Sequence, residues 1–279
     1  MGAHRYHYVD EGRGDPVVMV HGNPTWSFYY RRLISALRSD YRTIAPDHIG
    51  CGLSDKPTDS SYNYTLKQRV DDLEALLDHL GIDKKITLVL HDWGGMIGMA
   101  YAARQPERIA RLVILNTAAF LLPQTKRFPL ALTLCRGPVG AFLVRGLNLF
   151  CRGAASVGTK RSPLTQGARQ GYLSPYDSWR HRIAVHRFVQ DIPLREGDRA
   201  YAEVMAVERS LDRFADVPMQ LFWGEKDFVF DRHFLAEWQR RFPAAEVHSF
   251  ADAGHYVLED AFDEILPRVQ DFLRRHPIR

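Results

Sequence analysis

An aspartate stands between a hydrophobic run and a pair of glycines in residues 88–96, whose sequence is LVLHDWGGM. A strand that leads into a polar residue, two glycines and a helix is typical of a nucleophile elbow, where small residues permit a tight turn. Asp92 would be the nucleophile, and Leu90 stands where the serine form of the motif has its first glycine. The alternative is that Asp92 only caps the following helix. The positions of the other candidate residues favour the elbow.

A carboxylate nucleophile implies chemistry in two steps. Asp92 is ionised at pH 7 and attacks an electrophilic carbon without a base. The resulting ester must be hydrolysed by water, and that step needs a general base. His255 is the candidate base because it follows Gly254 after the last expected strand. In folds with this elbow, the histidine comes last in chain order, after the nucleophile and the acid.

The acid that orients His255 should lie at the end of an earlier strand. Asp227 follows the strand that resumes the sheet, whereas the strand before it ends in Asn116 and offers no carboxylate. Asp227 is therefore the predicted acid. Asp231 is the fallback, and Asp252 is too close in sequence to His255.

The sequence also indicates two backbone donors for an oxyanion. One is the N–H of Trp93, directly after the nucleophile, and the other belongs to the loop HGNPTW at 21–26. Asn23 is the expected donor in that loop. Four other polar residues near these motifs are expected to hold loops in place rather than transfer protons, namely His21, Asp47, His48 and His91.

Short apolar or β-branched runs predict strands at 6–9, 17–20, 42–45, 86–90, 112–115, 220–223 and 247–250. Helical periodicity or position predicts helices at 66–80, 96–105 and 262–274. Helix-length segments separate the four strands between 42 and 223. This alternation is typical of a mostly parallel sheet that helices cover on both faces.

About a hundred residues between 115 and 220 break the alternation, with no convincing strand and many Pro, Gly and Arg. A segment of this length is not a plain loop in a compact domain. We therefore predict a helical cap at 117–212, inserted into a core that consists of residues 1–116 and 213–279.

The composition excludes several classes of function. The 279 residues are 46% hydrophobic and 25% charged, as in ordinary globular enzymes. The net charge is +4 with scattered basic residues, which does not indicate nucleic-acid binding.

Three cysteines without a CxxC pair predict neither disulfides nor zinc, and a reducing, cytoplasmic location fits them. Arg136 and Arg145 interrupt the apolar stretch at 128–150, so no membrane span is expected. No metal cluster or phosphate loop appears, so no cofactor is expected.

Nearly the whole chain resembles the haloalkane dehalogenase family of the α/β-hydrolase superfamily. The matching segments are 21–24, 46–55, 91–95, 188–193 and 254–259. The resemblance implies a small apolar substrate, and side-chain N–H groups of Asn23 and Trp93 that hold the leaving halide. Neutral donors in a dry pocket suit that charge. The family usually has a strand before 6–9, so either the sheet has about seven strands or the chain is trimmed from a longer or fused polypeptide.

Further stretches are similar to the β-lactone decarboxylases of bacterial olefin synthesis, within the same family. They are 116–120, 175–179, 190–194 and 255–260. This resemblance implies a β-lactone substrate with two alkyl chains, an alkene and carbon dioxide as products, and dehalogenation of haloalkanes as a shared or side activity. The apolar stretch at 128–150 suits alkyl chains and equally suits ordinary packing. A partner enzyme of an olefin pathway and a homo-oligomer both stay open.

Two rival functions use the same fold. An epoxide hydrolase also has an aspartate nucleophile, and it needs ring-opening acids, for which Tyr172 or Tyr176 could serve; Asn23 argues against it. A receptor or scaffold protein would need no catalytic residues. The fold alone does not exclude it, but the complete set of nucleophile, base and acid does not fit it.

Overall fold

The seven predicted strands are all present and form one sheet. The structure is a computed structural model that describes residues 4–278. The strand order is β1-β3-β2-β4-β5-β6-β7. Their bounds are β1 Tyr8–Glu11, β2 Pro16–Val20, β3 Arg42–Pro46, β4 Ile86–Asp92, β5 Ile109–Thr117, β6 Met219–Gly224 and β7 Glu246–Phe250. Only β1, at one edge, is antiparallel to its neighbour, so the expected mostly parallel sheet is confirmed.

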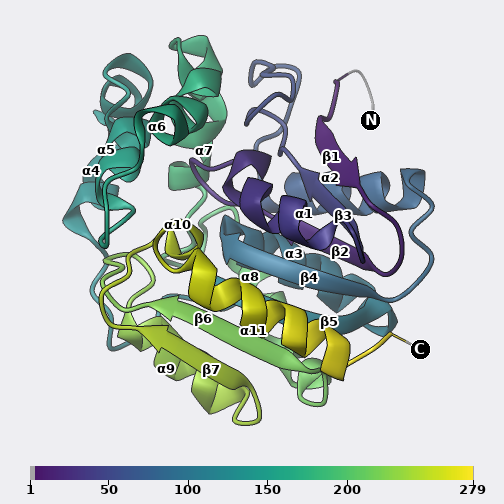
Figure 1. Cartoon of the computed structure of the whole chain (residues 1–279). Coiled ribbons are helices and arrows are strands. Elements are labelled where there is room, and N and C mark those ends of the chain that lie inside the picture. Colours follow the sequence, from purple (N-terminus) through teal and green to yellow (C-terminus); the bar gives the residue numbers. More distant parts are fainter. Residues whose placement is uncertain (1–3, 279) are drawn as a thin grey trace.

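Helices cover both faces of this sheet, which explains why its central strands are apolar throughout. Every residue of β4 is buried. Side chains alternate between the faces, so Leu88 and Leu90 join one hydrophobic cluster while Val89 joins the other. The first cluster contains α2 (Leu66–His79), α3 (Trp93–Arg104), α8 (Tyr201–Ser210) and α9 (Arg232–Arg241). The second contains α1 (Arg31–Leu37) and α11 (Phe262–Arg275), which cross the near face in Figure 1.

The predicted helix at 66–80 corresponds to α2, and its signals are local. The Thr65 side chain accepts a hydrogen bond from the N–H of Gln68, which is an N-cap. Gly81 follows the helix with a φ of 63°, a left-handed conformation that glycine adopts without strain. The helix expected at 96–105 begins three residues earlier, at Trp93, because the turn after β4 leads directly into α3.

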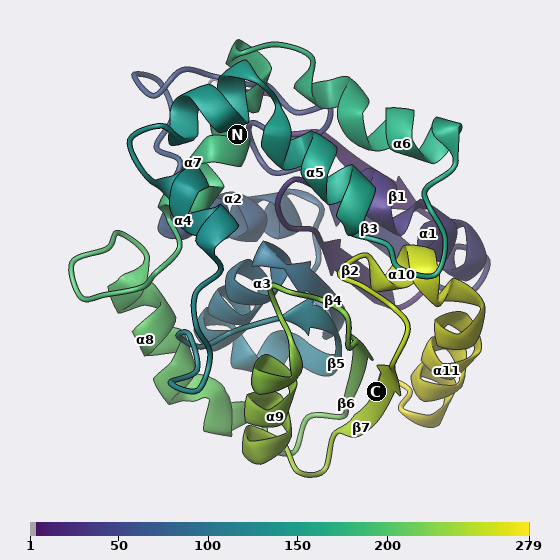
Figure 2. The same cartoon turned by 90° about the vertical axis from the view of Figure 1, so that its left-hand side faces the viewer.

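The segment between β5 and β6 consists of helices and turns. Its longer helices are α4 (Leu130–Arg136), α5 (Leu149–Val157), α6 (Gln166–Leu173) and α7 (Ile183–Gln190), followed by α8. In Figures 1 and 2, α4, α5 and α6 gather at one end of the molecule, beyond the main sheet. The division into a core and a cap at 117–212 stays a prediction, and α8, inside that range, packs against α3 of the core.

The remaining helical elements are short. They are η1 (Ser27–Tyr30), η2 (Pro106–Arg108), η3 (Phe142–Gly146), η4 (Ser174–Tyr176), η5 (Arg180–Arg182), η6 (Leu211–Phe214) and α10 (Val257–Asp260). Within residues 4–278, no helix is long and apolar enough to span a membrane.

Candidate active site

Asp92 lies at the turn between β4 and α3 in a strained backbone conformation. Its φ is 52° and its ψ is −126°, which is rare for a residue other than glycine. Its side chain makes no capping hydrogen bond to α3, so the geometry is not that of a simple helix cap. The two following glycines permit the turn. A Cβ on Gly94 would overlap the carbonyl oxygen of Val20, and one on Gly95 would overlap the side chain of Thr117. The turn therefore packs tightly between β2 and β5.

His255 lies between the two aspartates that the sequence singles out. Its Nε2 is 3.5 Å from Oδ2 of Asp92, and its Nδ1 is 2.7 Å from Oδ2 of Asp227. All three side chains are buried. The ring of Phe230 stacks on the imidazole, with the ring centres 5.9 Å apart. The structure thus brings together three residues that are far apart in the sequence.

Asn116, at the end of β5, positions Asp227 and was missed as a site residue. Its Nδ2 donates to Oδ2 of Asp227 at 3.1 Å, and its Oδ1 accepts from the N–H of Gly224 at 2.8 Å. The N–H of Val229 also donates to Asp227, at 2.7 Å. The feature of the sequence that could have identified Asn116 is its position at the carboxyl end of a parallel strand, where functional side chains of such sheets gather.

The electrostatic environments of Asp92 and His255 are coupled. Burial raises the pKa of Asp92, and the nearby His255 and the backbone N–H groups of Asn23 and Trp93 oppose that rise without cancelling it. Burial acts to lower the pKa of His255. The negative charges of Asp227 and Asp92 outweigh burial, so the pKa of His255 is raised.

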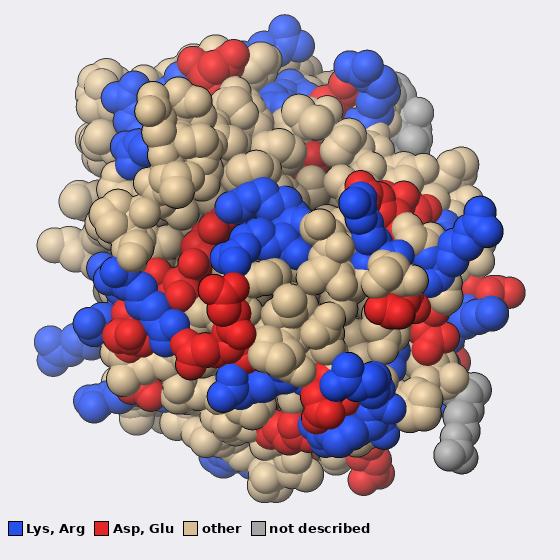
Figure 3. Space-filling view, in the orientation of Figure 1, with Lys and Arg blue, Asp and Glu red and all other residues tan. Residues whose placement is uncertain are grey.

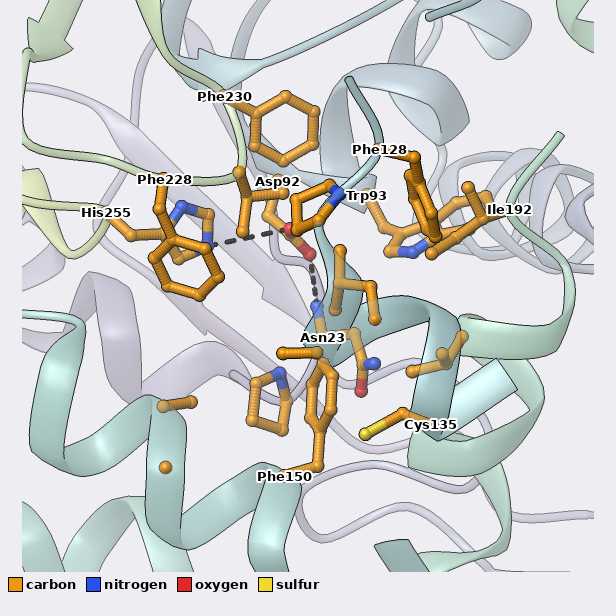
Figure 4. Close-up of a pocket in the computed structure, with 18 of the residues that line it drawn as sticks. Asn23, Asp92, Trp93, Phe128, Cys135, Phe150, Ile192, Phe228, Phe230 and His255 are labelled. Carbon is orange, nitrogen blue, oxygen red and sulfur yellow. Dashed lines mark hydrogen bonds and ion pairs between the residues drawn. The ribbon is translucent and has the colours of Figure 1, made fainter. Parts of the chain in front are cut away.

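Both predicted backbone donors form hydrogen bonds to the carboxylate of Asp92. The N–H of Asn23 donates to Oδ1 at 2.5 Å, and the N–H of Trp93 is also hydrogen-bonded to the carboxylate. Gly22 permits this approach, because a Cβ there would overlap the Asp92 side chain. Figure 4 shows Asn23 and His255 addressing different oxygens of Asp92. Oδ1 is thus held by the N–H of Asn23, while Oδ2 faces the imidazole.

The side chains of Asn23 and Trp93 lie in the wall of the same cavity as Asp92 and His255. One N–H of the Asn23 amide donates to the carbonyl oxygen of Val185 in α7, at 3.1 Å. The amide oxygen is buried without a hydrogen-bond partner among the described residues. The Trp93 ring packs against Phe188, with ring centres 5.4 Å apart. An amide nitrogen carries two N–H groups, so one donor of Asn23 is left for a ligand.

A cavity of about 410 Å³ opens onto Asp92 and is almost entirely apolar. Its volume lies in the range of small-molecule sites. The apolar stretch at 128–150 supplies much of the wall, including Phe128, Leu132, Leu143 and Phe150. A cavity of this kind suits an apolar substrate with a single reactive group.

The other aspartates weighed for the acid have different partners. Asp231 caps α9 by accepting from the N–H of His233 at 3.0 Å, and it pairs with Lys126. Asp252 pairs with Arg161 at the surface. Neither forms a hydrogen bond or an ion pair with His255. Asp227 is the carboxylate that the geometry brings to the imidazole.

All four polar residues expected to hold loops make such contacts. His91 Nε2 lies 2.8 Å from the carbonyl oxygen of His255, and His21 Nδ1 lies 2.7 Å from that of Gly22. Asp47 accepts from the N–H groups of Ser27 and Leu53. His48 does the same for the oxyanion loop, because its N–H donates to Nε2 of His21. These contacts surround the site without entering the cavity.

The tyrosines considered for epoxide opening have other partners and lie outside the cavity wall. The hydroxyl of Tyr172 donates to Glu259 at 2.5 Å, and that of Tyr176 to the carbonyl oxygen of Thr25 at 3.3 Å. The epoxide hydrolase alternative is therefore not favoured. Among residues 4–278, no group of three or more His, Cys, Asp or Glu could hold a metal ion.

Comparison with known proteins matches residues 15–262 to the family described as the alpha/beta hydrolase fold. The chain is 60% identical to the cis-3-alkyl-4-alkyloxetan-2-one decarboxylase of Shewanella oneidensis, over 96% of this chain and 85% of that protein. It is 47% identical to the protein of the same name from Xanthomonas campestris pv. campestris, over 97% and 93% of the two chains. Among solved structures, the haloalkane dehalogenase DatA of Agrobacterium tumefaciens superposes with a TM-score of 0.87 at 25% identity, over 99% and 94%.

Proposed function

We propose, from the premise that the chain belongs to the α/β-hydrolase fold family, that it converts β-lactones with two alkyl chains into alkenes and carbon dioxide. The observation that carries this proposal is the 60% identity to a cis-3-alkyl-4-alkyloxetan-2-one decarboxylase, against 33% identity to the haloalkane dehalogenase of Mycolicibacterium paratuberculosis. The apolar cavity above Asp92 supports it, because such a lactone is apolar except for its ring.

In the first proposed step, Oδ2 of Asp92 attacks the ring carbon that bears the ring oxygen. A carbon–oxygen ester bond to Asp92 forms, and the ring carbon–oxygen bond breaks with its electron pair on the oxygen. The leaving group is a carboxylate that stays attached to the neighbouring carbon. The side-chain N–H groups of Asn23 and Trp93, in the cavity wall, would stabilise its charge as they would a halide.

In the second step, the new carboxylate leaves as carbon dioxide. The electron pair of the broken carbon–carbon bond forms the alkene, and the bond to Asp92 breaks with its pair returning to the aspartate. The backbone donors of Asn23 and Trp93 stabilise the returning charge. The balance is one lactone to one alkene and one carbon dioxide. Water is not consumed, so this route needs no general base.

Dehalogenation is the second candidate activity, favoured by the structural similarity to a haloalkane dehalogenase. Asp92 would displace a halide and form an alkyl ester. His255 would then take a proton from water as the water attacks the ester carbonyl carbon. The carbonyl oxygen would become an oxyanion held by the N–H groups of Asn23 and Trp93. Collapse breaks the bond from the carbonyl carbon to the alkyl oxygen, which takes the proton back from His255 and leaves as an alcohol. The regenerated acid of Asp92 then releases its proton to solvent.

The proposal also includes residues 117–212 as the cap that encloses the site.

The location in the cell and a partner enzyme are the last parts of the proposal. The cysteines Cys51, Cys135 and Cys151 are free, which is consistent with the cytoplasm. A long-chain lactone is poorly delivered through water, so a partner enzyme that makes the lactone fits the reaction. The inference of a partner enzyme rests on the proposed substrate.

The test compares kcat/KM for a cis-dialkyl β-lactone with kcat/KM for 1-bromohexane, with the alkene identified by gas chromatography. We expect the lactone to be the better substrate and to give the cis alkene, because inversion at the attacked carbon followed by anti elimination preserves the cis arrangement. Asp92→Asn should lose both activities. The decarboxylase proposal is wrong if bromohexane is favoured tenfold or more and no alkene appears.

A further inference from the structure

One stretch of the chain is basic and has no acidic residue at all. Residues 118–176 contain no Asp or Glu, whereas the whole chain has 37 Lys or Arg and 33 Asp or Glu. The basic residues of this stretch are Lys126, Arg127, Arg136, Arg145, Arg152, Lys160, Arg161 and Arg169. Since the net charge of the chain is only +4, the rest of the protein is net acidic. Such asymmetry indicates an anionic partner for this stretch.

Three of these cations are exposed and make no ion pair with any described residue, namely Arg127, Arg152 and Lys160. Other cations of the stretch already form ion pairs with acidic residues outside it, as in the pairs Lys126–Asp231 and Arg136–Asp198. The exposed, unpaired cations are therefore the ones available to an external anion.

The same stretch exposes large apolar side chains at helical spacing. Leu130 and Leu134 lie one turn apart on the solvent side of α4, and Leu130 is 74% exposed. On α5, Leu149 and Val157 share the solvent side with Arg152. A surface helix normally turns polar residues to water. We call the exposed sides of α4 and α5 the cap face. Figure 2 shows these helices from the front, and in Figure 3 the upper left of the molecule, where they lie, is mostly tan with some blue side chains.

The mouth of the active-site cavity opens through the cap face. Leu134, Leu149 and Val157 line the cavity and are each more than two fifths exposed. Phe228, from the loop after β6, completes this rim and is 45% exposed. The route from outside to Asp92 is thus bordered by apolar side chains rather than by the usual polar rim.

We propose that the cap face binds to the surface of an anionic phospholipid membrane. Leu130, Leu134, Leu149 and Val157 would enter the boundary between head groups and acyl chains, while Arg152 and its neighbours meet the phosphates. Interfacial helices combine these two features, and cytoplasmic leaflets are anionic. Protein interfaces, by contrast, are depleted of charged residues at their core. An apolar substrate could then pass from the lipid into the cavity without crossing water, a consequence that rests on the proposed function.

The test is co-sedimentation of the full chain with vesicles of phosphatidylcholine alone or with added phosphatidylglycerol. We expect binding that requires phosphatidylglycerol and weakens with salt. Leu130→Gln and Arg152→Glu change cap-face residues that do not line the cavity. Arg152→Glu should reduce the partition coefficient roughly fivefold or more, since each cation near an anionic surface contributes about that factor. Leu130→Gln should also weaken binding.

Two matched controls lie outside residues 118–176. Arg13→Glu reverses an exposed charge between β1 and β2, and Leu53→Gln removes an apolar side chain that is 60% exposed. Both should bind vesicles as the unmodified protein does. Asp92→Asn should also bind, so loss of catalysis and loss of membrane binding are separable.

Equal loss of binding in the controls would overturn the proposal, as would binding that does not depend on phosphatidylglycerol. Absence of vesicle binding together with a self-association that Leu130→Gln abolishes would instead assign the cap face to a second copy of the chain. Unfolding temperatures of all variants, measured in parallel, would identify any loss caused by misfolding.

Discussion

The two ring nitrogens of His255 face different carboxylates, and this asymmetry separates the two proposed reactions. Nδ1 is held by Asp227 at 2.7 Å, while Nε2 lies farther from Asp92, at 3.5 Å. A water could be activated from the Nε2 side, next to the ester carbon on Asp92. The dehalogenase reaction uses this arrangement, whereas the decarboxylase reaction regenerates Asp92 without water.

We therefore expect His255→Ala to affect the two substrates differently. With 1-bromohexane, the variant should accumulate an alkyl ester on Asp92, because attack does not need the base and hydrolysis does. With a cis-dialkyl β-lactone, it should still turn over to alkene. Intact-mass analysis and peptide mapping detect the ester, and gas chromatography detects the alkene. An adduct on a residue other than Asp92 would contradict the assignment of the nucleophile.

The same asymmetry predicts different pH profiles. Hydrolysis of the bromohexane-derived ester needs neutral His255, so its rate should fall as the pH drops through the pKa of that residue, which Asp227 helps to raise. Lactone turnover needs only ionised Asp92. The pKa of Asp92 is raised by burial, but a protonated His255 beside it favours its charged form. The acid limb of kcat for the lactone should therefore lie at lower pH than the limb for bromohexane; coincident limbs would contradict the base-free route.

At the scale of elements, the site depends on how closely the turn after β4 packs against its neighbours. Leu90 occupies the place of a glycine in serine elbows, and Gly98 of α3 leaves room for it, because a Cβ there would overlap the Leu90 side chain. The hydroxyl of Thr117, at the end of β5, donates to the backbone carbonyl of Asp92. The elbow is thus fixed by β5 and α3 as well as by its own sequence.

Gly95→Ala should destabilise the protein, because the new methyl group would overlap Thr117 and the carbonyl oxygen of Ala118. Overpacking of this kind costs about 1–3 kcal/mol. Gly153→Ala in α5 is the matched control, since nothing lies within 4 Å of its would-be Cβ. It should stabilise by about 0.5–1 kcal/mol, as alanine does in helices. Urea unfolding measures both; equal free energies of unfolding would refute the packing account.

At the scale of the whole molecule, the cavity joins segments that lie far apart in the sequence. Its wall combines Asn23 near the start, Phe120 after β5, Leu132 of α4 and His255 near the end. The basic residues are scattered along the chain, as expected from the sequence. The acidic residues are not, since none falls within 118–176. This uneven charge places the cationic surface at the end of the molecule where the cavity opens.

The sequence by itself determined the strands, three core helices (α2, α3 and α11) and the family. Apolar runs of strand length and the α2 capping signals are local, and local interactions specify secondary structure when they agree with the fold. The motif around Asp92 and the chain order of Asp92, Asp227 and His255 are also readable from the sequence. The first residue of α3 could not be read from the sequence, because it depends on how the elbow turns.

Only the tertiary structure decided which of these residues meet. Asn116 reaches Asp227 because β5 and β6 are neighbours in the sheet, although 111 positions separate the two residues in the chain. One N–H of the Asn23 amide donates to the carbonyl oxygen of Val185 in α7, and no motif near Asn23 predicts this contact. Whether an apolar residue such as Leu130 faces the core or water likewise depends on what packs beside α4. Contacts between distant segments follow from how whole elements pack, and spacing along the chain carries little information about them.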